Sequence, residues 1–173
     1  MAINPGPDAE LTPQLAAYFN KCLEKIGFVP NVLKAYAFDT AKLQGFIDVV
    51  DNLMLADSGL SKLEREMIAV AVSAVNHCHY CLTAHGAAVR SRAKSAQFGD
   101  TIANNWRAAG LDRRQTAMLD FSVKLTEAPD KITEADRQAL RDAGFSDRDI
   151  FDIAAVAGFY NMSNRIAAAT EMQ

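Results

Sequence analysis

The sequence lacks the features that would place the protein in a membrane, on nucleic acid or outside the cell. Its longest apolar run, around residues 67–75, is too short to span a bilayer. The first residues contain no basic stretch followed by an apolar one, so we expect no signal peptide. A formal net charge of −3 provides no basic surface for nucleic acid. These absences favour a cytoplasmic protein that binds neither membranes nor nucleic acid.

Cysteine is also scarce, which argues against a fold held together by several disulfides. The chain has three cysteines, and two of them form the C-x-x-C pair Cys78 and Cys81. In a reducing compartment such a pair is typically redox-active or metal-binding rather than a structural crosslink.

Strand signals are almost absent, whereas helical periodicity with capping residues recurs along the chain. Thr12 followed by Pro13 predicts one helix start, and Ser61 with Glu64 predicts another through a capping box. We therefore predict an all-α, single-domain chain of eight or nine helices over residues 1–173. Its expected parts are N-terminal helices (1–57), a cysteine-containing helical hairpin (58–95) and a C-terminal half (96–173).

The C-terminal half contains a weak internal repeat of the hairpin's sequence pattern. A shift of 85 residues places Ser61 on Ser146 and Asn76 on Asn161. Duplication of a helical hairpin would explain this internal repeat. A shared preference for small residues in packed helices would explain it equally well. In the second copy, which lacks cysteines, the positions of Glu66, Cys78, Cys81 and His85 are taken by Phe151, Ser163, Ile166 and Thr170.

The spacing of four polar residues suggests a common site. If Cys78 opens a helix, then Cys78, Cys81 and His85 lie on one face, because residues three or four apart are neighbours. Two cysteines three apart are also close enough to form a disulfide. If the chain reverses near Asn76, Glu66 lies level with His85 across an antiparallel helix pair.

This arrangement has the order of a proton relay. A carboxylate can orient an imidazole, and the imidazole can accept the proton of a thiol. A helix N-terminus beside the cysteines would further favour the thiolate. The alternative is structural, with both cysteines packed as small apolar residues, His85 a core histidine and Glu66 a solvated first-turn acid.

Other chemistry for the pair fits less well. Zinc could be bound by Cys78, Cys81, His85 and either His77 or His79. Ligands along a single helix close a tetrahedral site awkwardly, and the chain has no second cysteine pair. We therefore expect no metal and no cofactor. His77 and His79 are expected to be exposed at the turn.

The spacing Glu66-x11-Cys78-x2-Cys81-x3-His85 resembles the signature of the alkylhydroperoxidase AhpD branch of the carboxymuconolactone decarboxylase superfamily. The Pro30-Asn31 segment and the chain length resemble that family's group of uncharacterised peroxidase-related proteins. One departure is Tyr80, which stands where AhpD has a histidine directly before the second cysteine.

The resemblance implies an AhpD-like helical bundle and a thiol-dependent peroxidase. It assigns the attack on the peroxide to Cys81, its resolution to Cys78, and the proton relay to Glu66 and His85. Tyr80 is included as a possible hydrogen-bonding member of the site, although a tyrosine is a poorer proton shuttle at neutral pH. A hydroperoxide substrate, an external dithiol reductant and a homo-oligomeric assembly are further implications.

Two other functions remain open at this stage. In the superfamily's other branch the pocket serves lactone chemistry without cysteine redox, so cysteine-to-serine variants would stay active. A non-catalytic oligomeric redox sensor would form the disulfide without turning over peroxide.

Overall fold

The computed structural model describes residues 1–172, and within them the chain forms nine α-helices and no strand. The all-α prediction is confirmed. The helices are α1 (Pro13–Ile26), α2 (Asn31–Tyr36), α3 (Thr40–Val50), α4 (Lys62–Val75), α5 (His79–Ala93), α6 (Ala96–Asn105), α7 (Arg113–Glu127), α8 (Glu134–Asp142) and α9 (Asp147–Ala169). Short helical segments lie at η1 (Asp51–Leu55), η2 (Trp106–Ala108) and η3 (Pro129–Lys131).

The helices begin where side chains can satisfy their free amides. Thr12 accepts a hydrogen bond from the amide of Leu15, with Pro13 at the first helical position, as predicted. Ser61 and Glu64 form the predicted capping box of α4. Gly27 ends α1 with φ +80°, a left-handed conformation that glycine adopts without steric cost.

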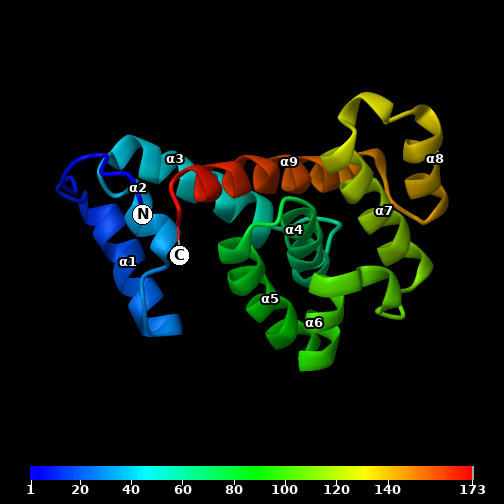
Figure 1. The fold of residues 1–173 in the computed structure, drawn as a ribbon, viewed down its shortest axis with the longest axis horizontal. Helices are drawn as coiled ribbons and strands as arrows, with labels where there is room; N and C mark the ends of the chain where they lie inside the picture. The colour runs from blue at the N-terminus through cyan, green and yellow to red at the C-terminus, as the bar shows by residue number, and fades with distance from the viewer. Residues whose placement is uncertain (173) are drawn as a thin grey trace.

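Helix α4 is the centre of the molecule. All residues from 64 to 73 are buried, and the helix packs against α5, α6, α7 and α9. Helix α9 runs along the long axis, with α5 and α6 below it and α7 and α8 at one end (Figure 1). Helices α1 and α2 form an N-terminal arm (residues 1–37) at the other end, beside the C-terminus (Figure 1).

Two buried charges tie the surrounding segments to α4. The Arg65 guanidinium donates to the carbonyls of Leu53, Ala56 and Leu60, and so closes the π-helical turn η1 onto the start of α4. The side chain of Glu64 pairs with Arg114 from α7 at 3.0 Å. In the described residues no helix is long and apolar enough to cross a membrane.

The chain reverses between α4 and α5, as the spacing predicts. Asn76 ends α4, His77 has φ +52°, and Cys78 is extended before α5 begins. The amide of Cys78 donates to the carbonyl of Ser73, which closes the turn. The structure differs at the corresponding place in the C-terminal half, because α9 continues unbroken through Asn161 and forms no second hairpin. The internal duplication therefore remains a hypothesis.

Candidate active site

Glu66 and His85 face each other across the α4–α5 pair. Nδ1 of His85 lies 2.8 Å from Oε2 of Glu66, and the Glu66 side chain is only 10 % exposed. A neutral imidazole that donates its Nδ1 proton to a carboxylate keeps Nε2 as an acceptor. Arg92, one turn beyond on α5, lies 3.8 Å from the other carboxylate oxygen. The carboxylate and the imidazole are thus held in a fixed relative orientation.

Tyr160 from α9 completes this side of the site. Its hydroxyl lies 3.4 Å from Nδ1 of His85, and the two rings meet edge to face with centroids 4.6 Å apart. Burial, followed by electrostatic interactions with Glu66 and Cys81, raises the pKa of Tyr160 well above its ordinary value. The phenol therefore stays protonated between the carboxylate–imidazole pair and the thiols.

The two thiols lie together at the start of α5. Cys78 is the N-cap residue and Cys81 lies in the first turn, and both side chains belong to one buried cluster. Both are free thiols, and Cys81 is 2 % exposed. Apolar and aromatic side chains from α2, α5, α9 and the C-terminal segment pack around them: Val32, Ala35, Tyr80, Ala167 and Met172.

Burial changes the expected acidity of Cys81. The helix N-terminus predicts a favoured thiolate, yet burial and the neighbouring Cys78 raise the pKa of Cys81 to about 12. Hydrogen bonds from Asn164 and Ser163 act in the opposite direction. Desolvation outweighs the helix terminus here because the sulfur is almost fully enclosed, so the resting site holds a neutral thiol.

Tyr80 packs beside the cysteines but directs its hydroxyl to the N-terminal arm. The hydroxyl oxygen accepts a hydrogen bond of 3.0 Å from the amide of Val32 at the start of α2. Burial raises the pKa of Tyr80, which keeps this hydroxyl neutral. In this geometry Tyr80 fastens α2 over the thiols.

The structure brings together some of the predicted site residues but not all of them in direct contact. Glu66 bonds His85, and Cys78 lies in the same buried cluster as Cys81, whereas no hydrogen bond joins His85 to Cys81 within the described part of the chain. His77 and His79 are exposed at the turn, as expected.

Comparison with known proteins identifies the family. The model of the Carboxymuconolactone decarboxylase family matches residues 41–118, which include Glu66, both paired cysteines and His85. An uncharacterized peroxidase-related protein from Silicibacter sp. TM1040 is 54 % identical, with a TM-score of 0.95 over 99 % of this chain and 90 % of that one. The chain belongs to the carboxymuconolactone decarboxylase family, in its AhpD-like, peroxidase-related group.

A second solved structure supports this AhpD-like assignment. It is an alkylhydroperoxidase AhpD core, an uncharacterized peroxidase-related protein from Ralstonia eutropha JMP134, and is 42 % identical. Its TM-score is 0.91 over 97 % of this chain and 90 % of that one. The debrominase Bmp8 shares the fold with a TM-score of 0.79 over 93 % of this chain and 86 % of that one, at 18 % identity. None of the curated proteins compared with this chain matches it.

The sequence prediction for this AhpD-like protein missed the contribution of α9. Tyr160, Ser163 and Asn164 all face the site, and their spacing of three and four residues puts them on one helix face. A sequence signal did exist, since Ser163 and Asn164 lie in a polar stretch between the largely apolar runs 153–160 and 166–169 of α9. Without the partner helix, that signal does not distinguish a site from a buried structural network.

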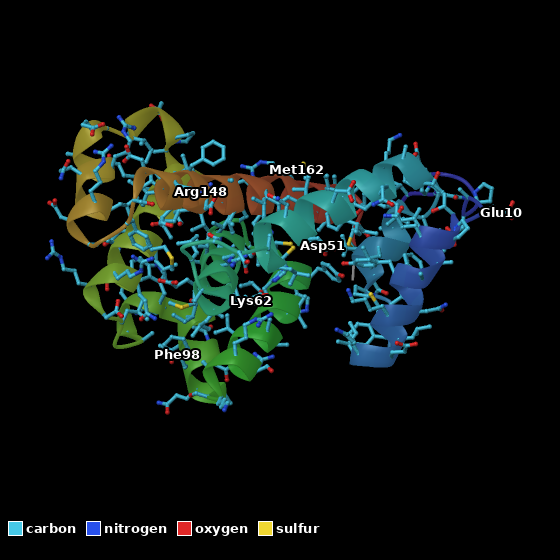
Figure 2. The ribbon with its side chains drawn as sticks, turned by 180° about the vertical axis from the view of Figure 1, so that it is seen from behind. Glu10, Asp51, Lys62, Phe98, Arg148 and Met162 are labelled. Carbon is cyan, nitrogen blue, oxygen red and sulfur yellow. The ribbon has the colours of Figure 1, made fainter. Side chains whose placement is uncertain are left out.

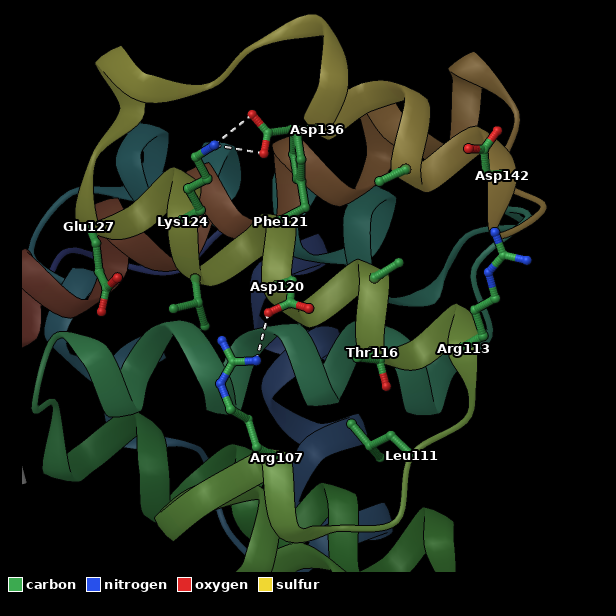
Figure 3. Close-up of a pocket in the computed structure, with 13 residues that line it drawn as sticks. Arg107, Leu111, Arg113, Thr116, Asp120, Phe121, Lys124, Glu127, Asp136 and Asp142 are labelled. Atoms are coloured by element: carbon green, nitrogen blue, oxygen red, sulfur yellow. Dashed lines mark hydrogen bonds and ion pairs between the residues drawn. The ribbon is translucent and has the colours of Figure 1, made fainter.

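A surface groove of about 740 Å³ lies elsewhere, between η2, α7 and α8 (Figure 3). Its charges are largely matched, because Arg107 pairs with Asp120 and Lys124 pairs with Asp136. None of the thiols lines it. This groove is therefore separate from the candidate site at the α4–α5 hairpin.

Proposed function

We propose that this protein is a thiol-dependent peroxidase that reduces a hydroperoxide with the Cys78–Cys81 pair. The observation that carries the proposal is the 2.8 Å Glu66–His85 hydrogen bond on the same helix pair as two buried thiols of one side-chain cluster. Family membership supports it, since two close relatives are described as peroxidase-related. Substrate, activity and residue roles are all part of the proposal.

In the proposed cycle Glu66 holds His85 through Nδ1, and Nε2 receives the thiol proton of Cys81. The proton passes through the bound peroxide or a water, because His85 does not bond the sulfur directly. The Cys81 thiolate attacks the distal peroxide oxygen and the O–O bond breaks. The returned proton yields the alcohol, or water from hydrogen peroxide, and Cys81 becomes a sulfenic acid.

The second half of the cycle regenerates the thiols. The Cys78 thiol condenses with the Cys81 sulfenic acid, forming a disulfide and releasing water. An external dithiol reductant then supplies two electrons and two protons and leaves as its own disulfide. The reaction requires no metal or cofactor.

The test is peroxide consumption with a dithiol reductant in four proteins. Cys22→Ser is the matched control, because Cys22 is a half-buried thiol on α1 that belongs to neither the pair nor its surrounding cluster. We expect Cys22→Ser to keep the native rate and Cys81→Ser to lose it. Cys78→Ser should stop after one equivalent of peroxide, with a sulfenic acid that dimedone traps at Cys81. Equal rates in all four proteins would refute the peroxidase.

A redox sensor is the second candidate, and the near-complete burial and raised pKa of Cys81 favour it. A sensor forms one disulfide per protein and then stays oxidised, even with excess reductant. Multiple turnovers therefore separate the two functions. Lactone chemistry, the third possibility, would survive both cysteine substitutions.

We propose further that the protein is a homo-oligomer. Large apolar side chains are exposed at the end of the arm, where Phe28 is 58 % exposed and follows the exposed Leu23 and Ile26. Others lie on the outer side of α9 at Phe151 and Met162, the latter labelled in Figure 2. Large exposed apolar side chains in these two regions mark candidate interfaces. Light scattering after size-exclusion chromatography tests it, and a mass of 18.8 kDa would contradict it.

A further inference from the structure

The turn between α4 and α5 leads directly into Cys78. His77 has φ +52°, and its amide donates to the carbonyl of Ala74 at 3.1 Å. The amide of Cys78 donates to the carbonyl of Ser73 at 3.0 Å. These two bonds form a Schellman motif, in which the left-handed position is usually a glycine. A histidine at that position costs conformational free energy, so the turn keeps this geometry only where other contacts hold it.

Helix α9 holds this turn at two points. Nδ2 of Asn76 donates to Oδ1 of Asn161 at 3.1 Å and to Oδ1 of Asn164 at 2.9 Å. Nδ2 of Asn164 donates to the hydroxyl of Ser73 at 3.0 Å. Ser73 is 0 % exposed and Asn164 is 2 % exposed, so water does not compete for these bonds. Ser73 therefore bonds α9 through its side chain and Cys78 through its carbonyl.

The α9 side of this network is itself fixed. Nδ2 of Asn161 donates to Oγ1 of Thr126 on α7 and to the carbonyl of Ala157, each at 3.0 Å. Nη1 of Arg165 donates to Oδ1 of Asn161 at 2.8 Å. An amide that is bonded through both its nitrogen and its oxygen has a single orientation. Asn76 is therefore attached to a rigid part of the helix bundle.

We propose that Asn76 is a positioning residue that keeps the thiol of Cys78 within reach of Cys81. Both thiols belong to one buried cluster, and a disulfide forms only when the two side chains approach closely in a narrow range of geometries. A turn that is fixed through Asn76 gives the two thiols a high effective concentration and so favours the disulfide. The redox activity of the pair rests on the proposed function, whereas the hydrogen bonds of the turn do not.

The experiment measures the dithiol–disulfide equilibrium of the pair in glutathione buffers. A Cys22→Ser background leaves Cys78 and Cys81 as the only thiols of the chain. Oxidation removes two electrons and two protons from them and converts one glutathione disulfide into two glutathione thiols. Asn76→Ala removes both bonds to α9. We expect its equilibrium constant for disulfide formation to fall about tenfold, which raises the reduction potential by about 30 mV.

Arg114→Met is the control for a general loss of stability. Arg114 pairs with Glu64 at the other end of α4, away from the turn. We expect the equilibrium constant of this variant to stay within about twofold of the background protein. Ser73→Ala removes the hydroxyl that Asn164 bonds but keeps the carbonyl that accepts from Cys78. It should lower the constant by about two- to threefold, since one bond is lost rather than two.

Each outcome bears on a different claim. An equilibrium constant for Asn76→Ala equal to that of the background, or an equal fall in Arg114→Met, would overturn the positioning role. If Asn76→Ala fails to fold by circular dichroism, Ser73→Ala decides, and an unchanged constant overturns the proposal. A background protein that forms no disulfide in any glutathione buffer would refute the redox pair of the proposed function and this inference with it. A lowered constant in a protein without peroxide turnover would support this inference and refute only the peroxidase.

Discussion

The chemistry of the site depends on a competition at one sulfur atom. Burial and the neighbouring Cys78 raise the pKa of Cys81, while the α9 donors favour its ionised form. The net result at rest is a neutral thiol. An imidazole held by Glu66 therefore has a clear purpose in the proposed mechanism, which is to receive a proton that the sulfur would not release unaided.

The raised pKa of Cys81 predicts how the stability of the protein depends on pH. An unfolded chain releases the Cys81 proton near pH 9, whereas the native chain holds it to about pH 12. Between these values the native state binds more protons, so the free energy of unfolding falls as pH rises. Urea unfolding at pH 8, 9 and 10 should show a fall that is smaller in Cys81→Ser, by up to about 1.4 kcal/mol per pH unit. Identical slopes would contradict the buried neutral thiol.

The sequence allowed prediction of the residues whose spacing follows from helical geometry. Cys78, Cys81 and His85 share α5, and a single reversal at Asn76 sufficed to place Glu66 opposite them. Asn164 could not be predicted in this way, because its hydrogen bond with Asn76 depends on the packing of α9, 88 residues later in the chain. Spacing constrains neighbours on one helix, whereas contacts between distant helices require the packed fold.

At the scale of elements, two glycines in helices should respond oppositely to the same substitution. Alanine favours a helix over glycine by up to about 1 kcal/mol. A Cβ at Gly158 in α9 meets nothing within 4 Å, so Gly158→Ala should stabilise by about 0.5–1 kcal/mol. A Cβ at Gly99 in α6 would lie 2.4 Å from Cγ of Arg90 and 3.2 Å from its backbone nitrogen.

Gly99→Ala must therefore push α6 away from α5. We expect it to destabilise by about 1–3 kcal/mol despite the gain in helix propensity. Thermal or urea unfolding of the two variants measures both effects. A stability change of the same sign in both variants would show that the α5–α6 contact at Gly99 does not determine the effect of the substitution. The close approach of Gly99 to α5 is visible only in the fold.

Arg114 joins three elements at the other end of α4. It pairs with Glu64 and donates to the carbonyls of Gly59 and Gly144. Arg114→Met leaves a largely buried carboxylate unpaired, so we expect a loss of about 1–3 kcal/mol in urea unfolding. The adjacent Arg113 is exposed, and Arg113→Met should change stability by less than about 0.5 kcal/mol. Equal effects would contradict the role assigned to Arg114.

For the whole molecule, burial is very unevenly distributed. Helix α4 is buried through ten consecutive residues, whereas α1 buries only Leu15 and is joined to α3–η1 by the Tyr18–Asp51 hydrogen bond. Local opening requires the least free energy where few apolar contacts are lost. Hydrogen exchange followed by mass spectrometry should show the slowest amides in α4 and fast amides in α1. Slow exchange throughout α1 would indicate that a second copy covers the arm.

The uneven distribution of burial also affects the Cys78–Cys81 pair. These two thiols are covered by the short helix α2 and by the C-terminal Met172. In the proposed peroxidase, a substrate reaches these sulfurs only when the arm or the C-terminal segment moves away from them. The rate of this local opening therefore limits turnover. This local opening would slow access of a bulky reductant more than access of a small oxidant. In the proposed cycle, oxidation would then be faster than re-reduction, so the disulfide form would persist after the peroxide has been consumed.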